Sequence, residues 1–166
     1  MTGAAEATAE RYRRAGETAD VELAMSTFAA DAVVHSPLTS RVRFTGLAQL
    51  RQLIGVAYAH LDGVRFHTDV GDERTRVVVY TARIGGEEIE EATVLRFDDE
   101  GLIAEATLFV RTLPGLVALM DRFGPDIARR NGRPLAARLL AVAVKPLRAM
   151  IRSGDRYAVP LAAPRS

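Results

Sequence analysis

The hydrophobic pattern changes period at Val64, and this change constrains the fold more than any other feature of the 166-residue chain. From Val64 to residue 113, apolar residues alternate with polar ones, as in β-strands that bury one face. Tight separators containing glycine or acidic residues divide this region, and consecutive strands joined by short turns pair antiparallel. We therefore predict an antiparallel meander of four strands, at residues 64–70, 76–84, 87–97 and 102–113.

The region before the meander has mainly helical spacing. Residues 4–15 are rich in Ala, Glu and Arg and predict a helix that ends near Gly16. The apolar positions of residues 21–31 fit a second short helix. Residues 32–37, AVVHSP, are alternating and β-branched, so they predict a strand that ends at its proline.

A third helix is predicted at residues 45–63, with Thr45 as its N-cap and Gly63 as its C-cap. A further helix follows Pro114 at the end of the meander. Helices grouped on one face of an antiparallel sheet define an α+β domain. We therefore predict this fold class, with the N-terminal helices packed on the sheet.

The C-terminal tail differs from the rest of the chain in charge. From Pro125 onward nine Lys and Arg face two Asp and Glu, whereas residues 1–124 carry thirteen and nineteen. We predict a domain at 1–124 and a basic, amphipathic helical extension at 125–166, whose helix starts near Pro134 and whose apolar stripe is interrupted at Pro146. Such a segment can bind an anionic membrane surface, but more often it packs on its own domain, caps a pocket or forms a dimer interface. Its apolar stripe comprises Leu135, Leu139, Val142 and Leu147.

The order of elements resembles the cone-shaped fold of the nuclear transport factor 2-like superfamily, which includes ketosteroid isomerase, limonene-epoxide hydrolase and the SnoaL-like polyketide cyclases. The resemblance is carried by FAADAVVHSP, by the helix after FTG, and by VLRFDDEGLIAEATLFVR, and it covers roughly Ala9 to Gly124. It implies a curved sheet around a deep, largely apolar cavity. It also implies a homodimer formed through the outer face of the sheet.

Turn chemistry predicts which side chains point into that cavity. Gly85-Gly86 is a two-residue hairpin signal, and it places Tyr80 opposite Glu91 on one face. A bulged turn at Gly101 then pairs Phe97 with Ile103. A slip of one residue would reverse the faces. With this register the inward face carries Tyr80, Glu91, Thr93, Phe97, Glu105, Thr107, Phe109 and Arg111.

Polar groups on an apolar wall predict a ligand pocket with acid/base chemistry. Glu91 is the candidate base, Arg111 its orienting partner, and Tyr80 a donor to a developing oxyanion. A trio of this kind can equally be a satisfied polar network. His35 is a candidate second acid/base group, because the resemblance places its strand at the pocket mouth. The predicted ligand contacts are Thr93, Glu105, Thr107, Phe109 and Phe97.

Several function classes lack their sequence signals. The chain contains no cysteine, no HxH or HExxH pattern and no glycine-rich phosphate loop, so we predict neither a metal nor another cofactor. The acidic body argues against nucleic acid, and the N-terminus lacks the apolar run of a signal peptide, which predicts a cytoplasmic protein. We predict binding of a small hydrophobic molecule, with or without its isomerisation, cyclisation or epoxide opening. The alternative is a non-catalytic ligand-binding or dimerisation module.

Overall fold

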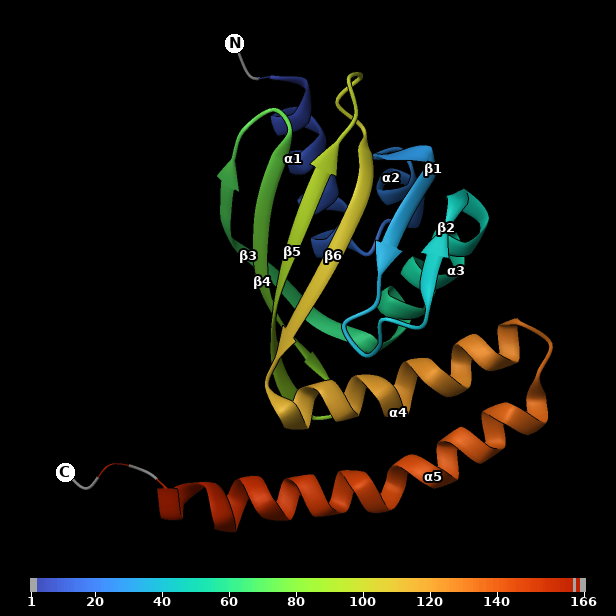
Figure 1. The fold of residues 1–166 in the computed structure, drawn as a ribbon, viewed down its shortest axis with the longest axis vertical. Helices are drawn as coiled ribbons and strands as arrows, with labels where there is room; N and C mark the ends of the chain where they lie inside the picture. Colours follow the sequence, from blue (N-terminus) through green and yellow to red (C-terminus); the bar gives the residue numbers. More distant parts are fainter. Residues whose placement is uncertain (1–2, 163, 165–166) are drawn as a thin grey trace.

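The predicted meander forms most of one curved sheet in the computed structural model, which describes residues 3–162 and 164 (Figure 1). The strands are β1 (Phe28–His35), β2 (Arg43–Thr45), β3 (Leu61–Gly71), β4 (Thr75–Ile84), β5 (Glu87–Phe97) and β6 (Ile103–Arg111). The helices are α1 (Ala4–Thr18), α2 (Val21–Met25), α3 (Gly46–His60), α4 (Leu113–Arg130) and α5 (Pro134–Ser153). A short π-helix, Gly154–Ala158, and a short 3-10 helix, Val159–Ala162, follow α5. The α+β class is confirmed.

The sheet order is β2-β1-β6-β5-β4-β3, and β1 runs parallel to β6 while the other neighbours are antiparallel. The predicted second helix is too long, because Phe28 already pairs with Ile103 at the start of β1. The third helix ends at His60 and not at Gly63, because Leu61 already pairs with Ile84 in β3. In both places a long-range strand pairing shortens a locally favourable helix.

The β4–β5 hairpin has the predicted register. Tyr80 lies opposite Glu91, and the turn residues Gly85 and Gly86 have positive φ angles of 56° and 88°. Glycine adopts this conformation without steric cost, which explains why the turn fixes the pairing. Val78, Tyr80, Ala82 and Ile84 are accordingly buried along β4.

The predicted β5–β6 register is wrong beyond its first pair. Phe97 pairs with Ile103 as expected, but Arg96 pairs with Glu105, so Ala104 is an extra residue on β6. This bulge moves every later side chain of β6 to the opposite face. The residues now on the outer face are Glu105, Thr107, Phe109 and Arg111, while Ala106 and Leu108 point inward.

The hydrophobic core lies between the inner face of the sheet and the helices. One cluster joins Leu95 and Ile103 to Leu50 of α3 and to Ala5 and Ala9 of α1. A second cluster joins the hairpin end of the sheet to Val56, Leu119 and Phe123. Between these two clusters the helices and sheet leave room for a cavity.

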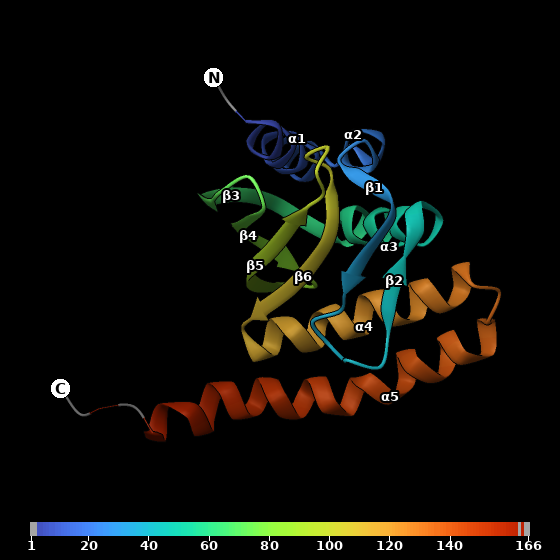
Figure 2. The same ribbon diagram turned by 45° about the horizontal axis from the view of Figure 1, so that its top comes forward.

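Helices α4 and α5 form an antiparallel pair across one end of the sheet, with α5 as the outermost layer (Figure 2). The boundary predicted after Gly124 falls inside α4, which continues to Arg130. Pro146 lies inside α5 without ending it. Within the described residues, neither helix nor any other is long and apolar enough to cross a membrane.

Candidate functional site

A cavity of about 500 Å³ lies between the inner sheet face and helices α1, α3 and α4. Its walls are mostly aliphatic and aromatic, which suits an apolar ligand. Aromatic rings form a continuous row along one wall, because the ring centroids of Phe28 and Tyr12, Tyr12 and Phe66, and Phe66 and Tyr80 are 6.0, 6.2 and 5.1 Å apart. Other apolar lining residues include Leu53, Ile54, Leu108, Leu119, Met120 and Phe123.

Among the residues that the structure describes, Glu91 supplies the one carboxyl group that lines this apolar cavity. Glu91 is only 4% exposed, and the Thr93 hydroxyl donates a hydrogen bond of 2.9 Å to its Oε1. Three tyrosines, Tyr12, Tyr58 and Tyr80, also line the cavity. The cavity therefore combines one proton-transfer group with several neutral hydrogen-bond donors.

The surroundings of Glu91 bring its protonation into the physiological range. Burial raises the pKa of Glu91 from the ordinary 4.5 to about 7, while hydrogen bonding from Thr93 and Tyr80 favours the carboxylate and limits the increase. Burial and the nearby negative charge of Glu91 raise the pKa values of Tyr12 and Tyr80. Burial raises the pKa of Tyr58 as well, and the negative charge of Asp20 raises it to a smaller extent. At neutral pH the three phenols are therefore protonated donors, and Glu91 can give or take a proton.

Replacing Thr93 with valine is expected to raise the pKa of Glu91 further above 7. Valine has nearly the same shape but cannot donate the hydrogen bond that stabilises the carboxylate. Carboxyl-carbon NMR titration of the variant measures this change. An unchanged Glu91 titration would contradict the assigned hydrogen bond.

The structure brings together only part of the predicted site. Glu91 and Tyr80 line the cavity, Thr93 supports Glu91 from the buried side, and Phe97 belongs to the core. Their catalytic and ligand-binding roles stay predictions.

Arg111 does not orient Glu91, because its Nη1 lies 2.9 Å from Glu90 Oε2 on the outer face. Glu105 is beside His35 at 3.6 Å, in a shallow depression of the outer face that Thr107 also lines. Phe109 is 58% exposed. The β6 bulge explains why the four predicted residues of β6 lie on the outer face. His35 lies on the same outer face, because β1 pairs with β6 and His35 is opposite Thr107.

Sequence reasoning missed Tyr12 and Tyr58 as site residues. A signal for Tyr12 is present, since Ala5, Ala9, Tyr12 and Gly16 recur at the spacing of one helix face. Ala5, Ala9 and Gly16 are buried, and Tyr12 and Gly16 line the cavity. The small residues of this stripe let helix α1 pack closely on the sheet, and Tyr12 is the large side chain on the stripe that reaches the cavity.

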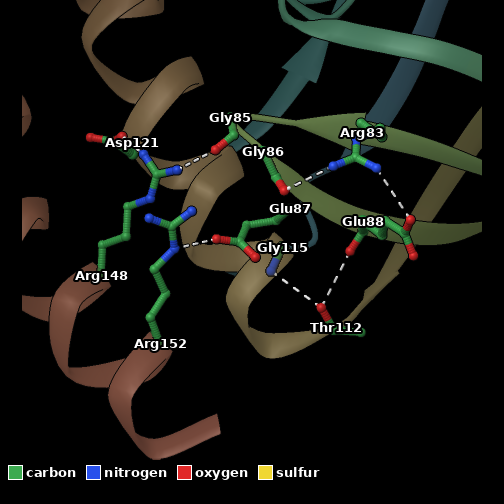
Figure 3. Close-up of polar contacts among 10 residues, drawn as sticks. All are labelled: Arg83, Gly85, Gly86, Glu87, Glu88, Thr112, Gly115, Asp121, Arg148 and Arg152. Carbon is green, nitrogen blue, oxygen red and sulfur yellow. Dashed lines mark hydrogen bonds and ion pairs between the residues drawn. The ribbon is translucent and has the colours of Figure 1, made fainter. Parts of the chain in front are cut away.

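The C-terminal helix completes the cavity wall. Leu140 and Val144 of α5 line the cavity beside Phe123 of α4. Arg148 anchors α5 by donating hydrogen bonds to Asp121 Oδ2 at 2.6 Å and to the Gly85 carbonyl at 2.5 Å (Figure 3). Arg152 adds an ion pair with Glu87, so the cavity end is held to the turn of the β4–β5 hairpin (Figure 3).

The remaining histidines occupy structural positions. His60 Nε2 lies 3.1 Å from Asp126 Oδ2 and joins α3 to α4, and His67 lies 3.5 Å from Glu90 on the outer face. Across residues 3–162 and 164, no three His, Asp or Glu side chains gather as potential metal ligands.

A family model described as a SnoaL-like domain matches residues 9–106, which is more than half of the chain. The chain belongs to the SnoaL-like domain family. The matched segment contains Tyr12, Tyr58, Tyr80 and Glu91 and ends before α4 and α5. The resemblance to the nuclear transport factor 2-like superfamily is thereby confirmed. Among curated proteins, none matches this sequence.

Solved structures share the fold of this SnoaL-like chain. A steroid delta-isomerase from Pseudomonas aeruginosa is 25% identical with a TM-score of 0.67, and the match covers 81% of this chain and 96% of that one. A bacterial protein with a cystatin-like fold from Silicibacter pomeroyi is 17% identical with a TM-score of 0.70, covering 80% and 93%. The epoxide hydrolase/cyclase-like enzyme SalBIII, of pyran ring formation in salinomycin, is 14% identical with a TM-score of 0.56, covering 65% and 91%. These similarities support a fold of the small-molecule isomerase and cyclase type.

Proposed function

We propose that this protein binds a small, largely apolar molecule in its cavity and catalyses a metal-independent proton transfer on it with Glu91. The observation that carries the proposal is a buried carboxyl with a pKa of about 7, set among tyrosine hydroxyls in an otherwise apolar cavity. General acids and bases work best when their pKa lies near the working pH. The similarity to a steroid delta-isomerase favours isomerisation as the reaction type.

In an isomerisation of this kind, the ionised Glu91 removes a proton from a carbon next to a ligand carbonyl. Negative charge then develops on the carbonyl oxygen, where a neutral tyrosine hydroxyl stabilises it by donating a hydrogen bond. The protonated Glu91 returns the same proton to the far carbon of the double bond, so the double bond moves and no proton is lost. Tyr12, Tyr58 and Tyr80 are the available donors. The apolar walls strengthen these interactions by excluding water.

The pH dependence of kcat/KM distinguishes a basic from an acidic role of Glu91. As a base, Glu91 must be ionised, so we expect kcat/KM for a β,γ-unsaturated ketosteroid to rise as the pH increases through about 7. The appearance of the conjugated ketone by ultraviolet absorbance measures the rate. A rate that falls over the same interval would assign an acid role, as in cyclisation or epoxide opening. A rate independent of pH from 5 to 9 would contradict both roles.

Ligand binding is tested separately from turnover by thermal-shift measurements with steroids, terpenoid epoxides and polyketide fragments. Ala57→Trp on the α3 wall fills part of the cavity and is expected to abolish the ligand-induced shift. Leu47→Trp is the matched control, because Leu47 is on the same helix, is 38% exposed and does not line the cavity. If no compound stabilises the parent protein, or if Ala57→Trp binds as well, the cavity is not the binding site.

A non-catalytic ligand-binding role is the second candidate. It is favoured because no ion pair joins Glu91 to a cation among the described residues, and the predicted partner Arg111 lies on the outer face with Glu90. Binding in the thermal-shift panel without turnover of any bound compound would support it. The predicted homodimer through the outer sheet face stays a prediction.

A further inference from the structure

The outer face of α5 carries an apolar stripe that no described residue covers. Leu135, Leu139, Val142 and Met150 lie on one side of the helix by their spacing, and their exposed fractions run from 63% for Met150 to 72% for Leu135 and Leu139. The opposite side, with Ala137 and Val144, is buried. The helix therefore has two apolar faces. The face with Ala137 and Val144 packs against α4 and the cavity, while the face with the stripe is exposed.

A row of basic side chains follows this stripe. Arg138, Lys145 and Arg152 recur every seven residues, which places them along one flank of the helix. Among the described residues, Arg138 and Lys145 have no ion-pair partner, while Arg152 contacts Glu87. Residues 129–156 contain eight basic side chains and a single acidic one, Asp155. An occupant of the stripe must therefore accept both apolar and positively charged groups.

A second copy of the chain does not meet this requirement. If two α5 helices packed antiparallel along the stripe, their basic rows would lie side by side and repel each other. If they packed parallel, the basic row would face Ala136 and Ala143, which offer no negative charge. The basic flank therefore stays uncompensated in either arrangement.

We infer that the outer face of α5 binds an anionic lipid membrane, with the helix lying in the plane of the interface. An apolar stripe bordered by Lys and Arg is the pattern of interfacial helices, in which the apolar side chains enter the acyl boundary and the cations meet the headgroups. The short helices after α5 add exposed apolar side chains at this end of the chain, namely Tyr157, Val159 and Leu161. Attachment needs no membrane-spanning helix.

Membrane attachment brings the cavity wall close to the lipid. Leu140 and Val144 of the same helix line the cavity, so an apolar ligand could pass from the bilayer past α5 without crossing water. This step rests on the proposed function, whereas the surface binding itself does not.

Co-sedimentation with lipid vesicles tests the surface. The full chain is expected to bind vesicles of equal parts phosphatidylglycerol and phosphatidylcholine but not vesicles of phosphatidylcholine alone. Added salt is expected to release the bound protein. Replacing Arg138 and Lys145 together with glutamine removes two charges and should weaken binding roughly 30-fold. Leu139→Glu should abolish it. Val70→Glu is the matched control, because Val70 is 58% exposed on β3, far along the chain from α5.

The variants also separate this inference from its alternatives. Equal binding to both vesicle types, or no difference between Leu139→Glu and Val70→Glu, would overturn it. Self-association in sedimentation that Leu139→Glu abolishes would overturn it in favour of a second copy. In solution, Leu139→Glu should keep the ligand-induced thermal shift, so failure of the membrane surface and failure of the cavity give different results.

Discussion

Replacing Glu91 with glutamine is expected to lower kcat by a factor of about 10²–10⁴ while leaving ligand binding in place. A positioned acid or base contributes rate enhancement of this order, and glutamine cannot exchange the proton. The amide fills nearly the same volume beside Thr93, so the cavity keeps its shape. Turnover of the ketosteroid and the ligand-induced thermal shift, measured on the same preparations, separate chemistry from binding.

The same variant is expected to be more stable than the parent protein at pH 8. Burial raises the folded-state pKa of Glu91 to about 7 from the ordinary 4.5, so the folded state binds more protons than the unfolded state between these values. The free energy of unfolding therefore falls as the pH rises from about 4.5 to about 7, by about 3 kcal/mol at most. Because glutamine does not ionise, the free energy of unfolding of the variant does not fall over this pH range. Urea unfolding at pH 5 and pH 8 measures both effects.

Glu90→Gln is the control for both effects. Glu90 neighbours Glu91 in β5 but points to the outer face, where it contacts Arg111 and His67. We expect it to keep turnover and to change stability by no more than about 1 kcal/mol, as for an exposed ion pair. If the two variants show the same pH dependence of unfolding, Glu91 does not titrate as a buried group.

The second large effect is expected for Arg148→Ala, which should release α5 from the body. The side chains of Arg148 and Asp121 are only 17% and 16% exposed, and Arg148 also binds the Gly85 carbonyl. Removing the cation leaves a mostly buried carboxylate and a carbonyl without their donor, at a cost of about 3 kcal/mol. Because the contact is local, we expect opening of α5 without unfolding of the sheet.

Hydrogen exchange measures this opening. Amides of α5 should exchange about 100-fold faster in Arg148→Ala, the factor that corresponds to about 3 kcal/mol, while β4 and β5 keep their protection. Lys145→Ala is the control, because Lys145 is exposed on the same helix without an ion-pair partner among the described residues. Unchanged α5 protection in Arg148→Ala would show that the apolar contacts of Leu140 and Val144 alone hold the helix.

The sequence by itself determined the features that depend on local chemistry. The change to two-residue alternation at Val64 located the meander, and Gly85-Gly86 set the hairpin register because few residues other than glycine accept two positive φ angles. That register alone placed Tyr80 and Glu91 on the buried face. Glu91, the proposed base, and Tyr80, one of its three candidate hydrogen-bond donors, were thus both predicted from the sequence before any packing was known.

Only the tertiary structure decided the features that depend on distant contacts. The bulge at Ala104 occurs where β6 pairs with both β5 and β1. Because of it, Ala106 and Leu108 face inward, where the sequence predicted Glu105 and Arg111. Tyr12 and Tyr58 reach Glu91's cavity only because α1 and α3 pack over the sheet. Local propensity specifies a turn. Which face the side chains occupy after a bulge, and how helices close a cavity, depend on which arrangement buries the most apolar surface. That arrangement is a property of the whole chain.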